Sequence, residues 1–537
     1  MKLFFTIVLC VISFTRIYSQ PYIEWAARYA GNTFNHFAKD MVLDDEGNVY
    51  VTGTLVVDSV NNDFITLKYD KFGSLAWVRT YDGPQSGEDE PAAIKVDKSG
   101  NVIVAGTSRD TAGPPVKTYS ATIKYSSSGD TLWIRRYLNQ DSLYHLVNGI
   151  VVDSSYSIYL FGQIHTAQSS NLLLTKYSPS GEIQWQNEFD AIGGIDAPRD
   201  IELDKRNNIS IYASTGLGGA LIKYNLEGDS VWGKYFSPQA VRDILFDAEN
   251  NAYLGGVLSS PKTNADFYLA KVDTLGNILW ERTYHNNSLN NVDDERDIFM
   301  DTKNYVYITG VSGKPGEQGW DYLTIKYNQD GDSLWVRRYN PVTTSNDEPV
   351  TVVVDRNENV FVTGKSGRFT LWDNISTVVY SPKGDEMFTL NYDTAFPFRN
   401  HRPIKALCDT SGHLFIGGIS QNANGKWDMV VLKYSPVVSS ISQISNEIPS
   451  SFELFQNYPN PFNSSTTIEY NIPKQGHIQI KVSDILGREI ATIVNSFHTP
   501  GGYKIIFNAD VYSSGVYFYS LVFEHNALQL KKFIIIK

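Results

Sequence analysis

The chain has 537 residues, of which 58 are Asp or Glu and 46 are Lys or Arg, so its formal net charge at pH 7 is -12. This acidic balance argues against a nucleic-acid partner, because phosphate binding needs clustered Lys and Arg. Hydrophobic residues make up 42% of the chain, which is typical of a folded protein, and the length predicts two or more domains.

Residues 1–19 are predicted to be a secretory signal peptide. Lys2 gives a positive start, the segment Leu3–Phe14 is almost wholly apolar, and Ser19 is a small residue at the cleavage position. The apolar segment is shorter than the roughly 18–20 residues that a membrane-spanning helix needs. No later stretch is apolar enough to span a membrane, so the sequence predicts an exported chain with no transmembrane span after the signal peptide.

Cleavage after Ser19 would remove Cys10 and leave Cys408 as the one cysteine. Cys10 follows Leu9, where a lipoprotein signal has a small residue, so a lipid anchor is the less favoured alternative. The mature chain then has no internal disulfide. Cys408 lies in a strand-like pattern, which predicts a small buried side chain rather than a catalytic thiol.

Residues 20–437 repeat one pattern of four strand-like runs eight times, with a period of roughly 50 residues. In the first copy the runs are Asp40–Asp44, Val49–Thr54, Asp63–Tyr69 and Leu75–Tyr81, all rich in β-branched and aromatic residues. Tight turns with Gly join the first run to the second and the third to the fourth. Four short antiparallel strands per repeat predict the blades of a β-propeller.

The phase of the repeat predicts a closed ring. An aromatic residue marks the fourth strand of each copy, but the series begins before the first complete copy and has no member after Tyr434. Glu24–Tyr29 is therefore expected to supply the outer strand of the last blade, which removes the unpaired sheet edges. The marker residues are Trp25, Trp77, Trp133, Trp185, Trp232, Trp280 and Trp335, with Phe388 in the eighth place.

These repeats resemble the secreted bacterial β-propeller repeat family, in which an Asp and a Gly-Asn turn are followed by a Lys-Tyr pair and a Trp. The resemblance covers roughly Gln20–Val437 and implies an eight-bladed propeller. In one copy Ser154–Ser157 replaces the Gly-Asn turn, and in another Ser214–Ala220 shortens the long connection. These departures leave local turn shape open but not the fold.

After Tyr434 the composition changes. Residues 438–451 are rich in Ser and Ile and are predicted to be a linker. Residues 452–537 then follow a different all-β pattern of about seven short runs, among them Thr467–Ile472 and Val516–Phe523. Short strands at this density predict a small β-sandwich.

The tail also carries a series of polar, Pro and Gly residues in a distinctive order. They are Tyr458, Pro459, Asn460, Pro461 and Phe462 in an opening segment, Asp484, Gly487 and Arg488 in a middle turn, Gly515 in a late strand and Lys537 at the end. This series resembles the type A C-terminal sorting domain of the type IX secretion system. The resemblance implies an immunoglobulin-like sandwich, contact with that secretion machinery, and secretion or attachment at the outer cell surface; whether the tail is cleaved stays open. The alternative is an accessory sandwich with no sorting role.

No residue pattern points to catalysis or to a cofactor. The propeller histidines include no pair at zinc-binding spacing, and the chain has neither a G-x-S-x-G elbow nor a phosphate-binding loop. We therefore predict no catalytic, cofactor-binding or metal-binding residues. The histidines concerned are His36, His145, His165, His285, His401 and His413.

Three acidic clusters leave calcium binding open. Glu88–Glu90, Asp293–Glu295 and Asn346–Glu348 each precede the first strand of a copy. Calcium prefers several oxygen ligands from one tight loop. Turn capping by solvated carboxylates is the favoured alternative, so little or no stabilisation by calcium is expected.

The predicted fold class is all-β: an eight-bladed β-propeller followed by a small immunoglobulin-like β-sandwich. The favoured function is a non-enzymatic exported propeller that displays loops to an extracellular glycan or protein ligand. The alternative is an exported enzyme with its site in the propeller funnel, either a hydrolase or a quinoprotein-like enzyme. Asp70–Trp77 and Asp273–Trp280 faintly resemble the tryptophan-docking repeats of quinoprotein dehydrogenases, but the chain lacks the adjacent cysteines that many of those enzymes have.

Overall fold

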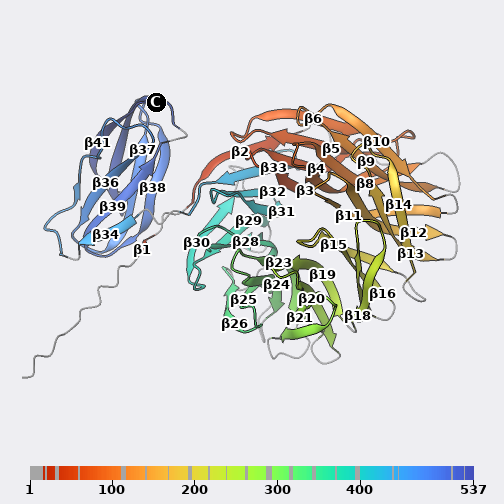
Figure 1. The fold of residues 1–537 in the computed structure, drawn as a ribbon. Helices are drawn as coiled ribbons and strands as arrows, with labels where there is room; N and C mark the ends of the chain where they lie inside the picture. The colour runs from red at the N-terminus through yellow and green to blue at the C-terminus, as the bar shows by residue number, and fades with distance from the viewer. Residues whose placement is uncertain are drawn as a thin grey trace, which may run out of the picture. The chain divides into compact units, whose positions relative to one another are not determined.

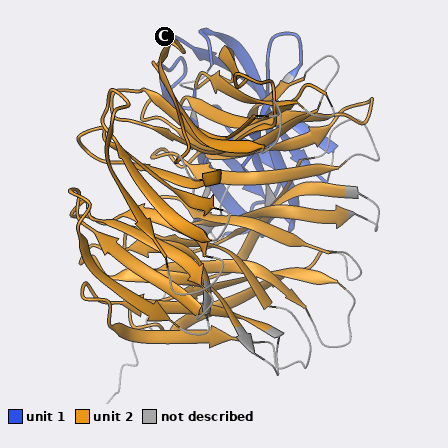
Figure 2. Cartoon of the chain, turned by 90° about the vertical axis from the view of Figure 1, so that its right-hand side faces the viewer, with its two compact units in different colours: residues 1–23, 434–537 blue, residues 24–433 orange. Residues whose placement is uncertain are grey.

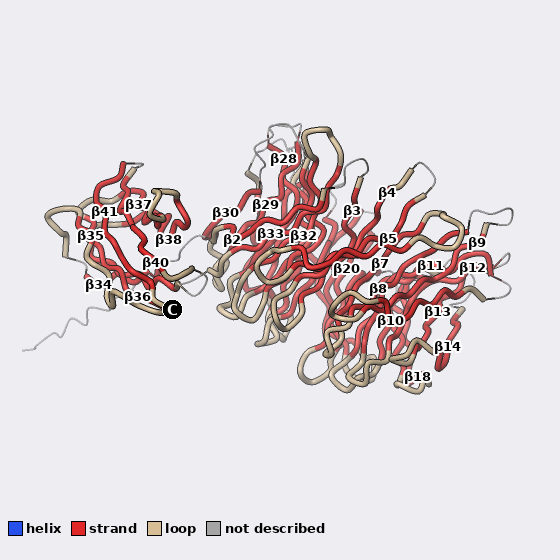
Figure 3. Tube along the Cα trace, turned by 90° about the horizontal axis from the view of Figure 1, so that it is seen from above, coloured by secondary structure: helices blue, strands red, loops and turns tan. Residues whose placement is uncertain are grey.

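The computed structural model describes residues 16–17, 21–30, 35–58, 61–110, 116–139, 142–166, 169–190, 196–215, 218–236, 239–260, 264–285, 293–313, 319–341, 346–368, 372–392, 400–437, 441–445, 447–509, 512–524 and 526–537. Every helix or strand found in these ranges is a β-strand (Figure 3), which confirms the all-β fold class. The chain divides into two compact units, residues 24–433 and residues 1–23 with 434–537 (Figure 2).

Residues 24–433 form a β-propeller, in which small antiparallel sheets are arranged around a common centre with the first strand of each repeat innermost (Figure 1). Five described sheets contain four strands in sequential order. They are β3 (His36–Leu43), β4 (Val49–Val56), β5 (Asn62–Tyr69) and β6 (Leu75–Tyr81); β15 (Ala197–Leu203), β16 (Ile209–Thr215), β17 (Gly218–Tyr224) and β18 (Ser230–Phe236); β19 (Gln239–Phe246), β20 (Ala252–Ser260), β21 (Asn264–Val272) and β22 (Ile278–Tyr284); β23 (Asp293–Met300), β24 (Val306–Gly313), β25 (Trp320–Tyr327) and β26 (Ser333–Tyr339); and β27 (Glu348–Val354), β28 (Val360–Arg368), β29 (Trp372–Tyr380) and β30 (Glu386–Tyr392).

Two consecutive repeats share one hydrogen-bonded sheet of eight strands. A single parallel residue pair, Tyr144 of β11 with Thr118 of β9, joins its two halves. The predicted number of eight blades treats the two halves as separate blades. The strands are β7 (Asp89–Val96), β8 (Val102–Asp110), β9 (Lys117–Tyr125), β10 (Thr131–Tyr137), β11 (Ser142–Val152), β12 (Ile158–Thr166), β13 (Ser170–Tyr177) and β14 (Ile183–Phe189).

The last propeller sheet contains strands from both ends of the propeller sequence. Its strand order is β2 (Ile23–Tyr29), β33 (Trp427–Tyr434), β32 (Leu414–Gln421) and β31 (His401–Cys408). The N-terminal strand is thus the outer strand of the last sheet, the position that the repeat phase predicts for Glu24–Tyr29. An outer strand from the far end of the chain pairs the edge that β33 would otherwise leave open.

Each marker tryptophan docks on a turn of the neighbouring sheet. Nε1 of Trp77 donates a hydrogen bond to the carbonyl oxygen of Ser127 at 3.2 Å, and Nε1 of Trp25 donates to that of Lys71 at 3.1 Å. The ring of Trp25 covers Gly73, where a Cβ atom would lie 2.6 Å from the indole and where φ is +84°. Trp25 therefore joins the last sheet to the first as Trp77 joins the first sheet to the next. The other indole donors are Trp133, Trp185, Trp232, Trp280 and Trp335.

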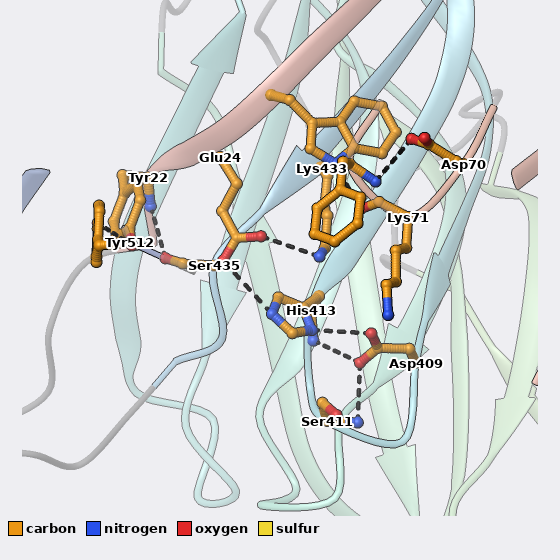
Figure 4. Close-up of polar contacts among 12 residues, drawn as sticks. Tyr22, Glu24, Asp70, Lys71, Asp409, Ser411, His413, Lys433, Ser435 and Tyr512 are labelled. Carbon is orange, nitrogen blue, oxygen red and sulfur yellow. Dashed lines mark hydrogen bonds and ion pairs between the residues drawn. The ribbon is translucent and has the colours of Figure 1, made fainter. Parts of the chain in front are cut away.

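A charged cluster on the closing strand adds to this junction (Figure 4). Glu24 lies between two cations, with Oε2 3.0 Å from Nζ of Lys433 and Oε1 3.4 Å from Nε2 of His413. Nδ1 of His413 lies 2.8 Å from Oδ2 of Asp409. The residue before the aromatic marker is uncharged in every other repeat: Ala76, Leu132, Gln184, Val231, Leu279, Leu334 or Met387. Glu24 is thus a departure from the repeat that occurs in the closing strand.

The propeller cores lie between neighbouring sheets. Tyr50 and Trp77 of one sheet pack with Val104, Ile123 and Tyr125 of the next, and all five side chains are buried. Burying a large apolar side chain contributes about 1.5–3 kcal/mol, so this repeated contact is the main source of cohesion between sheets.

The second unit contains two sheets that enclose one hydrophobic core, including Ile468, Ile480, Tyr519 and Phe533. This is the predicted β-sandwich. One sheet has the order β1 (Arg16–Ile17), β34 (Ile441–Ser445), β39 (Gly501–Asn508), β36 (Ser465–Ile472) and β35 (Glu453–Leu454). The other has the order β38 (Glu489–His498), β37 (Gly476–Ser483), β40 (Gly515–Phe523) and β41 (Asn526–Ile535).

The structure differs from the predicted linker, residues 438–451, because β34 lies inside it. β34 pairs antiparallel with β39, with Ile441 opposite Ile505 and Gln443 opposite Tyr503. The Ser- and Ile-rich composition was therefore compatible with an edge strand as well as with a linker. β1 lies in the predicted signal peptide and pairs with β34. The rest of the predicted signal peptide lies outside the described residues. Cleavage after Ser19 would leave β34 at the edge of its sheet.

Candidate functional site

The opening segment of the tail is fixed to the sandwich through Asn457. This side chain is buried, and its Nδ2 donates to Oγ1 of Thr466 at 2.9 Å and to the carbonyl oxygen of Pro459 at 3.1 Å. Its backbone N donates to the hydroxyl of Tyr519 at 2.8 Å. The following Tyr458–Pro459 and Asn460–Pro461 peptide bonds are both cis. A buried amide thus sets the path of the segment that contains the predicted residues.

Asn460 and Phe462 hold this segment against the last strand, β41. Oδ1 of Asn460 accepts a hydrogen bond from the backbone N of Ile534 at 3.0 Å, and the backbone N of Phe462 donates to the carbonyl oxygen of Ile534 at 3.1 Å. The Phe462 ring is buried against Phe533, with ring centroids 5.5 Å apart. Pro459 and Pro461 are exposed, and Tyr458 is 81% exposed. The predicted residues thus include two that anchor the segment and three that face solvent.

Asp484, Gly487 and Arg488 form a tight turn between β37 and β38. Oδ1 of Asp484 accepts hydrogen bonds from the backbone N atoms of Leu486 at 2.9 Å and Arg488 at 3.0 Å, and its Oδ2 accepts one from Nε of Arg488 at 2.7 Å. Gly487 has a φ of +77°, which explains the glycine. The Arg488 side chain is 74% exposed, so its guanidinium is both oriented and accessible.

The structure brings this turn together with Gly515. Asp484, Arg488 and Gly515 line a surface depression of about 520 Å³, together with Tyr512 and Tyr517. The C-terminal end lies beside it, because the backbone N of Lys537 donates to Oγ of Ser514 at 2.9 Å. The ten predicted residues therefore form two sets, one along β41 and one around this depression.

Sequence reasoning missed the tyrosines of the depression as site residues. The hydroxyl of Tyr517 donates to the carbonyl oxygen of Ser513 at 3.0 Å, so one side of the depression is held rigidly. Tyr517 follows the predicted Gly515 by two residues in the late strand, and this proximity was the available signal. Tyr512 had no signal, because its proximity to Arg488 depends on the pairing of distant strands.

Each of the three acidic clusters of the propeller contains one buried aspartate. Asp89, Asp293 and Asp347 are buried, and each bonds to a residue of the adjacent strand. Asp293 accepts a hydrogen bond from the hydroxyl of Ser312, and Asp347 accepts one from Ser366. These carboxylates stabilise strand pairs from buried positions, whereas the sequence predicted solvated carboxylates that cap turns. Among the described residues no group of three or more His, Cys, Asp and Glu side chains is arranged to hold a metal ion.

Cys408 is half-buried, so it is more exposed than its strand pattern predicts. Burial raises the pKa of its thiol well above the usual range, with Asp355 and Asp409 adding to the effect. The uncharged thiol is the weak nucleophile, so the environment opposes thiolate chemistry. Within the described ranges, no helix is long and apolar enough to cross a membrane.

Residues 456–537 match the family model described as the secretion system C-terminal sorting domain. They form a type IX secretion C-terminal sorting domain. The sorting domain indicates export to the cell surface or the medium and implies interaction with the secretion machinery. Both sets of predicted residues lie within it.

No curated protein matches the chain. Similar solved structures include the Dos1 propeller, with a TM-score of 0.47 and 8% identity over 78% of this chain and 95% of that one. PorZ, a surface component of the type IX secretion system of Porphyromonas gingivalis, has a TM-score of 0.25 and 10% identity over 93% and 87%. The polysaccharide lyase Uly1 has a TM-score of 0.41 and 9% identity over 76% and 91%. Structures this distant assign neither a ligand nor an activity.

Proposed function

We propose that this chain is a non-enzymatic display protein, in which the sorting domain delivers the propeller to the cell exterior and the propeller binds an extracellular glycan or protein. The observation that carries the proposal is the combination of a sorting domain with a propeller whose connections differ between its two faces. The exported location is established by the tail, and the ligand is the proposed part.

Strand direction separates two kinds of connection. Neighbouring strands are antiparallel, so the connections between the first and second strands and between the third and fourth lie at one face. These turns are uniform: Asp44 accepts from the backbone N of Asn48 at 2.9 Å, and Asp70 accepts from that of Ser74 at 2.8 Å. The connections at the opposite face vary in length, from residues 216–217 between β16 and β17 to residues 285–292 between β22 and β23. Variable connections on a rigid scaffold are where binding residues concentrate in proteins.

The test is a binding screen of the mature chain, residues 20–537, on a glycan array and against extracts of cell surfaces. The informative variant replaces residues 84–86, which lie exposed in the connection between β6 and β7 at the variable face, with Gly and Ser. The matched control replaces Asp330, in a tight turn of the opposite face, with Asn. We expect binding that the loop variant weakens at least tenfold and the turn control retains. Catalytic breakdown of an arrayed polysaccharide would favour an enzyme with its site in the propeller funnel instead.

A further inference from the structure

The first strand of each propeller repeat contains a β-bulge, and the bulged residue changes character around the ring. In three consecutive repeats it is an arginine: Arg199 in β15, Arg242 in β19 and Arg296 in β23. Bulges re-aim a side chain because the extra residue lies outside the pairing pattern, and they are frequent next to functional sites. The three arginines are therefore a departure from the repeat that is confined to one part of the ring. The bulged residues of the other repeats are Lys39, Ala92, Asn148, Val350 and Ile404.

The three arginines lie on neighbouring strands at the inside of the ring. β15, β19 and β23 are consecutive innermost strands (Figure 1). Arg242 reaches from β19 to β23, where its Nη1 donates a hydrogen bond to the carbonyl oxygen of Glu295. Each arginine is the third or fourth residue of a strand that starts at the variable face. The connections of that face therefore extend beyond the arginines, which lie recessed near the centre of the ring.

Two of the arginines share a single carboxylate. Nη2 of Arg242 lies 2.7 Å from Oδ1 of Asp294, and Nη2 of Arg296 lies 3.2 Å from Oδ2 of the same side chain. Both arginine side chains are 35% exposed, so a ligand can reach them. Arg199 is exposed as well, and its Nε donates to the neutral hydroxyl of Ser214 at 2.8 Å. In the part of the chain that the structure describes, no carboxylate forms an ion pair with Arg199.

The buried carboxyl groups nearby engage one another or the next sheet rather than the arginines. Asp243 and Glu295 hydrogen-bond to each other, and burial raises the pKa of both, to about 8 for Glu295, so the two groups share a proton. Asp200 and Asp297 each accept a backbone N–H of the next sheet at 2.8 Å. The arginine cluster therefore keeps a net positive charge after its one ion-paired carboxylate is taken into account.

We propose that Arg199, Arg242 and Arg296 bind a carboxylate group of an extracellular acidic glycan near the centre of the ring. Guanidinium groups pair with carboxylates through parallel hydrogen bonds, and the anion that Arg242 and Arg296 hold in the structure is itself a carboxylate. A glycan chain is slender enough to enter a recessed site, whereas the carboxylates of a folded protein lie on a convex surface. The inference rests on the proposed function, because it names the ligand class and the place at which the propeller binds it.

The experiment titrates the mature chain, residues 20–537, with oligogalacturonate and with its methyl ester, which has the same sugar rings without their charge. We expect saturable binding of oligogalacturonate, at least tenfold stronger than that of the ester. Binding should weaken as the sodium chloride concentration rises, because salt screens the attraction between exposed charges. Dextran sulfate tests a different anion: tighter binding of dextran sulfate than of oligogalacturonate would overturn the assignment to a carboxylate.

Two variants locate the site. Arg199→Ala and Arg296→Ala each introduce the residue type that the bulge of β7 has, so both should melt close to the wild type. Each should weaken the binding of oligogalacturonate at least tenfold. The matched control, Arg356→Ala, removes the same charge from an exposed tight turn of the opposite face and should leave binding unchanged.

The outcomes separate this inference from the proposed function. Oligogalacturonate binding that survives both arginine variants, or the absence of saturable binding to the unaltered chain, would overturn the inference. A neutral glycan or a protein as the ligand in the binding screen would overturn it too, while the proposed function would stand. The proposed function itself fails if neither the glycan array nor the surface extracts yield a ligand.

Discussion

Nε2 of His413 lies 3.4 Å from Oε1 of Glu24, and this contact connects the turn before β32 with the strand that closes the ring. Asp409 holds the other ring nitrogen of the same histidine at 2.8 Å. Partial burial lowers the pKa of His413, but the hydrogen bonds and charges of Asp409 and Glu24 outweigh it and raise the pKa to about 9. The histidine is therefore a cation at neutral pH, held between two carboxylates.

The closing cluster should make stability depend on pH in the alkaline range. The folded-state pKa of about 9 exceeds the ordinary value of 6.5, so protonated His413 stabilises the fold fully below pH 6.5. This stabilisation is lost as the pH rises through about 9. The full shift corresponds to about 3.4 kcal/mol, and solvent screening of the partly exposed cluster reduces this to about 2 kcal/mol. Urea unfolding of the wild type and of His413→Asn should show a difference in unfolding free energy at pH 6 that is absent at about pH 10.

His165→Asn is the matched control for this experiment. Burial lowers the pKa of His165, so its charge contributes no stabilisation that alkaline pH would remove. A His413→Asn effect that is the same at both pH values would mean that His413 is uncharged in the folded protein.

Two glycine variants separate backbone strain from the tryptophan contact. Gly73 and Gly425 have φ values of +84° and +75°, but a Cβ atom at Gly73 would meet Trp25, whereas one at Gly425 has no atom within 4 Å. Gly425→Ala should cost about 1 kcal/mol for the left-handed backbone. Gly73→Ala should cost about 1–3 kcal/mol more, because the indole must move. Equal melting temperatures for the two variants would contradict the docking of Trp25 on this turn.

Removal of the closing strand should weaken the propeller more than the loss of one side chain does. Deletion of residues 20–31 exposes the edge of β33 and removes Trp25, and the truncated chain should melt at a lower temperature and be cleaved faster by trypsin. Truncating a buried Trp typically costs about 3–5 kcal/mol, and loss of the half-buried Trp25 side chain alone should cost less. Trp133→Ala, which affects a junction away from the closure, is the comparison: it should lower the melting temperature without opening the last sheet. Unchanged melting after the deletion would exclude closure by β2.

The sorting domain should be separable from the propeller if the chain is divided before β34, so that this strand stays with the sorting domain. A chain that ends at Val437 should give a folded propeller that stays in the periplasm of a host with type IX machinery, because each unit has its own core. Fusion of residues 438–537 and the signal peptide to an unrelated soluble protein should send that protein to the surface or medium. Release of the truncated propeller at the normal rate would show that the tail is an accessory domain.

Asn460 and Tyr458 should affect export in different ways. Asn460→Ala removes the bond to Ile534, so it should lower the unfolding free energy of the sorting domain by about 1 kcal/mol. Tyr458 is 81% exposed, so Tyr458→Ala should leave the fold intact. If the aromatic ring contacts the secretion machinery, this second variant should still reduce export, measured by fractionation and immunoblotting. Normal export of Tyr458→Ala would assign Tyr458 no direct role.

The repeat made the propeller strands predictable, because β-branched runs and glycine turns recur at fixed spacing. The place of Glu24–Tyr29 in the last sheet also followed from the sequence, through the phase of the tryptophans. β34 was missed since a short edge strand and a linker have similar composition. Glu295 was expected only as a member of an acidic loop cluster, but it lies in β23 with a fully buried side chain, because burial depends on how neighbouring sheets pack and not on local composition.

The pairing of β2 with β33 has a consequence for the order of events during export. Residues near position 24 cannot reach their final partners until the chain has been made as far as Tyr434. The last sheet is therefore completed by contacts of very high sequence separation, which form slowly. The N-terminal strand therefore has no β33 to pair with until nearly the whole propeller sequence has been synthesised.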